Sequence, residues 1–141
     1  MEDLRVSLCQ ADLAWEDPQA NFKLFEQLFE QIEQTDLILL PEMFNTGFSM
    51  RSSDLAEKMD GATINWMQKQ AKKKQAVICG SLIIEENGEH FNRLIWMKSN
   101  GECETYDKRH LFRMANENDH FSAGNKRLIV ELKGWKIMPL V

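Results

Sequence analysis

The sequence predicts an α+β fold, in which early helices pack on a sheet and later strands pair antiparallel. Three observations support this prediction. Two amphipathic helical patterns occupy the first half of the chain, each between short apolar runs. Two turn signals, Asn87-Gly88 and Asn100-Gly101, divide the second half into short strands, as hairpin turns do. Helices that come early and strands that come late favour a layered α+β sheet over a doubly wound one.

The first half predicts a strand, a helix and a second strand. The first strand covers residues 5–13, an alternating run. Asp17 and Pro18 then start a helix that continues to about residue 34, because Asp caps a helix and Pro suits its first position. The continuous apolar run at residues 37–40 is typical of a strand that is buried on both faces.

The rest of the chain predicts a second helix followed by five strands. Residues 45–53 are irregular, and Asp60-Gly61 opens a helix with one apolar face. A polar loop at residues 113–125 interrupts the strands. The strands are expected at residues 76–85, 91–98, 102–108, 127–132 and 135–141.

The composition is that of a globular protein and excludes several partners. The 141 residues are 43% hydrophobic and 28% charged. The net charge of −5 argues against nucleic-acid or anionic-membrane partners, because both require a basic face. No apolar run approaches the length of a membrane span, and the first residues lack the form of a signal peptide. Three cysteines, an odd number, fit a reducing compartment, so we expect a cytoplasmic protein.

Two charged residues follow predicted strands, and each has a chemical and a structural interpretation. Glu42 follows the buried run at residues 37–40, where a partly dehydrated carboxylate can transfer protons near neutral pH. Lys108 ends another strand, where an ammonium group can stabilise negative charge that develops on an oxygen. The structural alternatives, a strand-end acid and a solvated basic patch, are commoner. Glu117, taken alone, is a surface residue of the polar loop.

Other kinds of site find little support. His110 and His120 belong to no Cys, His or carboxylate spacing that is typical of a metal site. No glycine-rich phosphate loop follows a strand. The cysteines, Cys9, Cys79 and Cys103, fit neither a zinc motif nor a CxxC redox motif.

Six short segments together resemble the nitrilase superfamily of carbon–nitrogen hydrolases. Any one of them is weak evidence, but their order and spacing are specific and extend over essentially the whole chain. They are residues 5–10 (RVSLCQ), 39–44 (LLPEMF) with Gly47-Phe48, 79–81 (CGS), 91–93 (FNR), 106–112 (YDKRHLF) and 121–124 (FSAG).

This resemblance implies an αββα sandwich, of which residues 1–141 would be the N-terminal part, and a Glu-Lys-Cys catalytic triad. By resemblance, Glu42 matches the general base and Lys108 the lysine that stabilises the tetrahedral intermediate. Glu117 matches a second glutamate that orients the lysine and the substrate. None of the three cysteines fits the nucleophile, which we expect just after Val141, where the last strand ends.

The segments 41–49 and 134–141 are most similar to omega-amidases, which hydrolyse the terminal amide of 2-oxoglutaramate or 2-oxosuccinamate. The implied function is a thiol-dependent amidohydrolase that releases ammonia through a cysteine thioester and needs no metal or organic cofactor. Phe44 is a candidate for the pocket wall. Arg113, or alternatively Arg51, is a candidate partner for a substrate carboxylate. The expected partners are the small-molecule amide and, in a homodimer, a second copy of the protein.

Other functions stay open at this point. Amidases of the same superfamily that act on N-carbamoyl or aliphatic amides would carry the same triad. If the protein ended at Val141, it would lack the nucleophile, and a non-catalytic binding protein would be expected. In an unrelated α+β binding domain, the motif matches would be due to chance.

Overall fold

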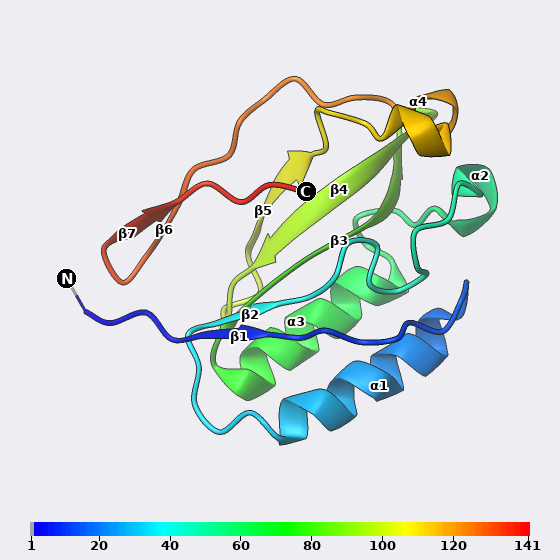
Figure 1. Cartoon of the computed structure of the whole chain (residues 1–141). Coiled ribbons are helices and arrows are strands. Elements are labelled where there is room, and N and C mark those ends of the chain that lie inside the picture. Colours follow the sequence, from blue (N-terminus) through cyan, green and yellow to red (C-terminus); the bar gives the residue numbers. More distant parts are fainter. Residues whose placement is uncertain (1) are drawn as a thin grey trace.

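A computed structural model describes residues 2–141, which fold around one mixed sheet of five strands in the order β1-β2-β3-β4-β5 (Figure 1). The neighbouring strands β1, β2 and β3 run parallel, whereas β3, β4 and β5 pair antiparallel. The long β3–β4 and β4–β5 hairpins turn at the two predicted Asn-Gly pairs. The strands are β1 (Val6–Leu8), β2 (Leu37–Leu39), β3 (Val77–Glu86), β4 (Glu89–Met97) and β5 (Cys103–Asp107).

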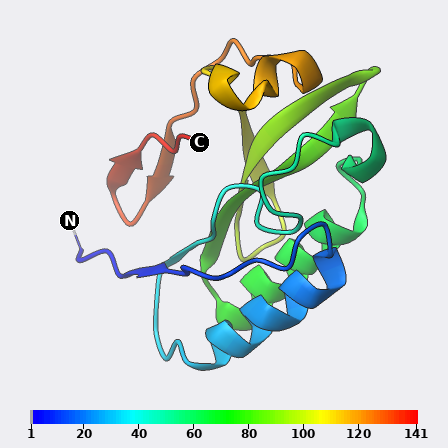
Figure 2. The ribbon, with the colours of Figure 1, turned by 45° about the vertical axis from the view of Figure 1, so that its right-hand side comes forward.

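Helices cover one face of this sheet and a separate hairpin lies on the other face (Figures 1 and 2). The helices α1 (Pro18–Glu30) and α3 (Ala62–Lys74) lie side by side and connect the parallel strands. The hairpin consists of β6 (Val130–Leu132) and β7 (Trp135–Ile137). The predicted fold class, helices layered on a sheet whose later strands are antiparallel, is confirmed.

Two apolar cores lie on the two faces of the sheet. Because side chains alternate along a strand, Ile38 packs with the helices while Leu37 packs toward the hairpin. The prediction that this strand is buried on both faces is therefore confirmed. The helix side is rich in aromatic rings, among which Phe22 stacks on Trp66 with their centroids 5.0 Å apart.

Helices α1 and α3 each begin where a carboxylate accepts a hydrogen bond from a backbone N–H group of the first turn. Asp17 Oδ1 accepts from Ala20 N at 3.0 Å, and Pro18 occupies the first turn of α1, as the sequence predicts. Helix α3 begins where predicted, but its cap comes from a distant residue: the Glu57 carboxylate accepts from Thr63 N at 2.8 Å. A carboxylate at this end also suits the positive pole of the helix dipole.

Three strands are much shorter than predicted, and one of them is the strand predicted at residues 127–132, which forms only as β6 at Val130–Leu132. A strand is predicted at residues 5–13, but β1 ends at Leu8 because β2, which lies beside it, has only three residues. The run at residues 135–141 is likewise paired only as far as Ile137, because β6 also has three residues.

Several helical turns depart from the sequence prediction. Helix α1 ends at Glu30, about one turn before the predicted end at residue 34. A short helix, α2 (Ser52–Leu55), forms within the predicted irregular stretch. The predicted polar loop contains a 3₁₀ turn, η1 (Arg113–Ala115), and a short helix, α4 (Glu117–His120). These turns are too short to produce a helical repeat in the sequence, so periodicity cannot find them.

Within residues 2–141, no helix combines the length and the apolar character that a membrane crossing requires.

Gly80 of β3 lies where the loop after β2 packs directly on the sheet. A Cβ at this position would lie 2.8 Å from Phe44 Cδ1 and 2.9 Å from Leu40 Cβ. The Phe44 ring is fully buried and cannot move aside. We therefore expect Gly80→Ala to lower the free energy of unfolding of the full-length protein by about 1–3 kcal/mol, as measured by denaturant titration.

Gly101 provides the control for this prediction. Its φ is +89° and the space around it is open, and asparagine tolerates such a conformation. Gly101→Asn should change the free energy of unfolding by less than about 0.5 kcal/mol. Equal stability of the Gly80→Ala and Gly101→Asn variants would contradict the tight packing at Gly80.

Candidate active site

The structure brings together three of the residues that the sequence singles out. Lys108 Nζ lies 2.7 Å from Glu42 Oε1 and 3.0 Å from Glu117 Oε2. Glu42 lies in the loop after β2, Lys108 directly follows β5, and Glu117 begins α4. The Glu117 side chain is 0% exposed and that of Lys108 is 9% exposed, whereas Glu42 keeps 36%. The lysine is thus buried between two carboxylates, one of which is open to solvent.

The pKa of Lys108 is raised above its usual value. Burial alone would lower this pKa by penalising the charged amine, but the hydrogen bonds and charges of Glu42 and Glu117 outweigh that effect. The resulting stabilisation of the fold is complete below the pKa of the unfolded chain, and it is lost as the pH rises through the folded pKa. At neutral pH the Lys108 side chain therefore donates hydrogen bonds and does not act as a base.

Asn92 of β4 completes this group, although the sequence analysis does not select it as a site residue. Its Nδ2 donates to Glu42 Oε1 at 2.8 Å and to Glu117 Oε1 at 3.2 Å. The residue is 0% exposed, and its Oδ1 finds no hydrogen-bond partner in the described part of the chain. The signal in the sequence is the segment FNR at residues 91–93, which is one of those that resemble the nitrilase superfamily but assigns Asn92 no role. Glu42, Asn92, Lys108 and Glu117 are called the Glu42 cluster below.

A tight turn that is bonded to β3 positions Glu42. The next residue, Met43, adopts a left-handed conformation with φ +47°, which non-glycine residues rarely do. Ser81 holds this turn at two points. Its hydroxyl accepts from Met43 N at 2.9 Å, and its carbonyl accepts from Phe44 N at 3.2 Å. The backbone on both sides of the Glu42 carboxylate is therefore fixed to the sheet, since Leu40 N also donates to a carbonyl of β3.

A loop with fastened ends positions Lys108 and Glu117. Lys108 N donates to the carbonyl of Asn92, and the Lys108 carbonyl accepts from Gly124 N, both at 2.9 Å. Gly124 packs so closely on Asp107 that a Cβ would overlap the Asp107 backbone. Within the loop, the Glu117 carboxylate accepts from Phe112 N at 2.6 Å. Residues 109–123 thus leave and rejoin the sheet at one place and carry Glu117 back to Lys108.

Glu42 also borders a cavity of about 290 Å³. Leu140 and Val141 lie in its wall, so the last described residues border the same cavity as Glu42. The remaining lining residues are Leu39, Leu40, Cys79, Gly80, Ser81 and Leu94.

Of the neighbouring aromatic residues, Phe48 and not Phe44 faces the Glu42 cluster. Lys108 Nζ lies 5.3 Å from the centroid of the half-buried Phe48 ring, a cation–π distance. Phe44 is 0% exposed and lies edge-on to Phe25 with their centroids 5.8 Å apart. The structure therefore places Phe44 in the core rather than in a pocket wall.

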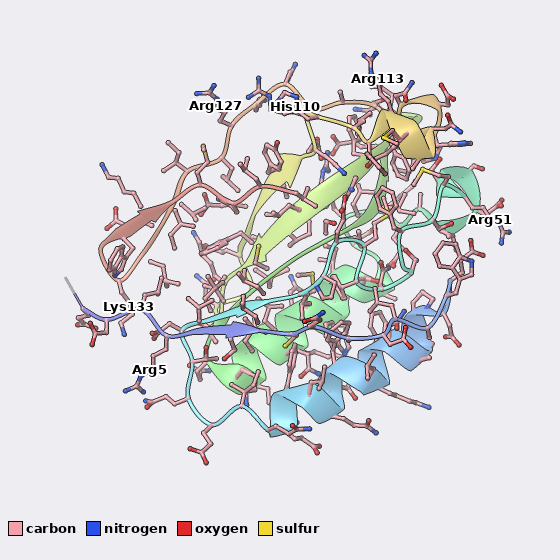
Figure 3. The ribbon with its side chains drawn as sticks, in the orientation of Figure 1. Arg5, Arg51, His110, Arg113, Arg127 and Lys133 are labelled. Atoms are coloured by element: carbon pink, nitrogen blue, oxygen red, sulfur yellow. The ribbon has the colours of Figure 1, made fainter. Side chains whose placement is uncertain are left out.

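The two candidate arginines lie outside the cluster. Arg51 is paired with Glu16 at 2.7 Å and with Asp54 at 3.0 Å, and its side chain is 61% exposed. Arg113 is exposed on η1, and its side chain lies at the outer edge of the fold (Figure 3). No ion pair joins Arg113 to another residue in the range 2–141.

The cysteines are poor nucleophiles in this environment. Burial raises the pKa of Cys79 to about 12, and burial is also the main cause of the raised pKa values of Cys9 and Cys103. Cys79 lies in the cavity beside Glu42, but as a neutral thiol with 4% exposure. Across residues 2–141, no three His, Cys, Asp or Glu side chains gather as metal ligands would.

The model of the carbon–nitrogen hydrolase family matches residues 5–141. The chain belongs to the carbon–nitrogen hydrolase family.

Two of the curated relatives that the chain matches are named as amidases. The chain is 42% identical, over 141 residues, to omega-amidase YafV of Escherichia coli K12, covering 100% of this chain and 55% of that protein. It is 29% identical to 2-oxoglutaramate amidase of Bacillus subtilis, covering 96% of this chain and 54% of that protein. The chain therefore spans about half the length of the curated relatives that it matches.

Solved structures share the same arrangement. A CN-hydrolase superfamily protein of Xanthomonas campestris, whose active site holds an arsenic adduct, superposes with a TM-score of 0.96 at 45% identity, covering 99% of this chain and 53% of that chain. An amidase of Nesterenkonia sp. AN1 superposes with a TM-score of 0.83 at 22% identity, covering 98% of this chain and 57% of that chain. The mixed sheet with its flanking helices is thus the fold of the nitrilase superfamily.

The raised pKa of Cys79 gives a testable order of thiol reactivity. With a pKa of about 12, only about one Cys79 side chain in ten thousand is a thiolate at pH 8. We expect iodoacetamide at pH 8 to label Cys79 more slowly than Cys9 or Cys103, which are half-buried. Peptide mass spectrometry of the native full-length protein measures the three rates. Labelling of Cys79 as fast as that of Cys9 would show an accessible, activated thiol.

Proposed function

We propose that the full-length protein is an omega-amidase, which releases ammonia from the terminal amide of a small 2-oxo acid amide such as 2-oxoglutaramate or 2-oxosuccinamate. The observation that carries this proposal is the buried Lys108, held between Glu117 and Glu42, of which Glu42 borders a cavity. The relatives named omega-amidase and 2-oxoglutaramate amidase support the substrate class. In this proposal residues 1–141 are the N-terminal part of a single hydrolase domain, in a cytoplasmic homodimer.

The proposed nucleophile is a cysteine that follows Val141. Support comes from the cavity, where Leu140 and Val141 lie in the same wall as Glu42, so that the chain leaves the described region beside the carboxylate. Glu42 accepts the thiol proton, because a thiolate is the reactive form of cysteine. The thiolate then forms a C–S bond with the amide carbon, and the π electrons of the carbonyl move to its oxygen.

Lys108 stabilises the oxyanion that this attack creates. Its raised pKa keeps it protonated, so it can donate to the oxygen without a proton transfer. Glu42 then returns its proton to the amide nitrogen, the C–N bond breaks, and ammonia leaves. Water attacks the thioester while Glu42 takes its proton. The C–S bond then breaks, the carboxylic acid product leaves, and Glu42 returns its proton to the thiolate, which restores the thiol. Glu117, which accepts from Lys108 Nζ, keeps Lys108 aimed at the oxyanion.

The proposed roles of Glu42 and Lys108 can be tested by substitution in the full-length protein. Glu42→Gln removes the base, and Lys108→Ala removes the oxyanion donor. Each change should lower kcat/KM for 2-oxoglutaramate by at least about a hundredfold, measured as ammonia release. N-carbamoyl amino acids and aliphatic amides serve as alternative substrates in the same assay, and a preference for either would identify another amidase of the family.

The chain offers a matched control for this pair. Lys98, which directly follows β4, and Glu104 of β5 form a Lys–Glu pair of the same 2.7 Å length, but both side chains are 38% exposed. Lys98→Ala and Glu104→Gln should leave kcat/KM within about threefold of the wild type, since exposed pairs contribute little. Near-normal activity of Glu42→Gln or Lys108→Ala would contradict the proposed mechanism.

Arg113 remains the proposed partner of the substrate carboxylate. Arg113→Ala should raise KM for 2-oxoglutaramate by about tenfold and leave kcat almost unchanged, because a charge-assisted bond far from the reacting carbon contributes uniform binding. Arg127→Ala is the control, since Arg127 is also an exposed arginine of the same upper edge (Figure 3). Steady-state kinetics that show equal KM values for the two variants would exclude Arg113 from substrate binding.

A further inference from the structure

We propose that Asn92 is a positioning residue that determines which oxygen of Glu42 accepts the proton. The proposal rests on the proposed function, because it assumes that Glu42 is the base. It concerns a side chain that the mechanism above does not use. Asn92 acts through Glu42 and Glu117 and touches no substrate atom in this proposal.

The hydrogen bonds of the Glu42 cluster distinguish the two oxygens of Glu42. Oε1 accepts from Lys108 Nζ at 2.7 Å and from Asn92 Nδ2 at 2.8 Å. Oε2 receives no hydrogen bond from any residue between positions 2 and 141. With Oε1 occupied twice, Oε2 is the oxygen available to a thiol or a water molecule in the cavity that Glu42 borders.

The four side chains form a closed ring around two like charges. Lys108 bridges Glu42 and Glu117 on one side, and Asn92 Nδ2 bridges the same two carboxylates on the other. Two carboxylates that share one site tend to retain a proton between them. A single ammonium group can offset only one negative charge, and the Asn92 Nδ2 group supplies a further hydrogen bond to each carboxylate.

Few other groups face Glu42 in the cluster. Lys108 at the end of β5 and Glu117 of α4 are the charged ones, and Asn92 of β4 and the Phe48 ring are neutral. Replacing Asn92 by an acid would therefore add a third carboxylate to two carboxylates and one ammonium group.

Among residues 2–141, the hydrogen bonds of the Asn92 side chain all go to the carboxylates of the Glu42 cluster. A buried amide oxygen without a donor destabilises the fold, so this position is not optimised for packing. The Nδ2 group, by contrast, makes two charge-assisted hydrogen bonds. The side chain is thus well satisfied only toward the carboxylates of the Glu42 cluster.

Asn92→Asp in the full-length protein tests the proposal, because it keeps the shape and replaces the donor by an acceptor. For 2-oxoglutaramate at pH 7, kcat should fall about 10- to 100-fold while KM stays within about threefold. The acid limb of the profile of kcat/KM against pH should move upward by about one pH unit, because the crowded carboxylates hold a proton longer. Asn92→Ser, which retains one donor, should show a smaller shift in the same direction.

Asn45→Asp provides the matched control. Asn45 is also buried with an unpaired Oδ1, and its Nδ2 donates to the Glu57 carboxylate at 3.1 Å and to Thr63 at 3.0 Å. The same substitution therefore crowds a carboxylate outside the Glu42 cluster. Asn45→Asp should lower the melting temperature about as much as Asn92→Asp and leave the acid limb in place.

The outcomes separate this inference from the proposed function. A wild-type protein without activity on any amide would overturn the proposed function and with it the role of Asn92. An active wild type whose acid limb is unchanged in both Asn92 variants would overturn the inference alone. If neither Asn92 variant folds, the residue serves the stability of the fold, and the inference is also overturned.

Discussion

The burial of one ammonium group is the constraint on which the rest of the structure depends. An ionised lysine is stable inside a protein only when carboxylates and hydrogen bonds replace its water. Lys108 obtains these partners from two segments, one of which lies 66 residues away in the sequence. The turn at Met43, the end of β5 and the loop that carries Glu117 must therefore all be in place at once. The ion pairs act as a cross-link as well as a site.

The sheet provides the rigidity that such an arrangement requires. Ser81 and Asn92 project from β3 and β4, the longest strands, which are buried over most of their length. Their hydrogen bonds fix the loop of Glu42 and the carboxylates of Glu42 and Glu117 to the sheet. The apolar core under the helices lies on the same sheet but shares no side chain with the Glu42 cluster. Polar groups held by strands are placed more accurately than groups held by loops alone.

Features that depend on neighbouring residues were predicted well from the sequence, whereas features that depend on partners far along the chain were not. Asp17-Pro18 and the two Asn-Gly turns depend on neighbouring residues, and the structure has them where predicted. The end of β1 depends on the length of β2, which lies about thirty residues further along the chain. Asn92 was missed because its role depends on carboxylates 50 and 25 residues away. Family resemblance supplied Glu42, Lys108 and Glu117, which spacing alone would have left as surface charges.

The loop over residues 109–123 is closed at its base by the bond between Gly124 N and the Lys108 carbonyl. Its inner side holds Glu117 against Lys108, while its outer turn exposes Arg113 and Met114. Because the two ends stay fastened, the outer turn can be exchanged without moving the lysine. Combinatorial libraries that randomise residues 113–115 would thus vary the rim around a constant Glu42 cluster. Under the proposed function, the same molecule offers a scaffold for amidases with new selectivity.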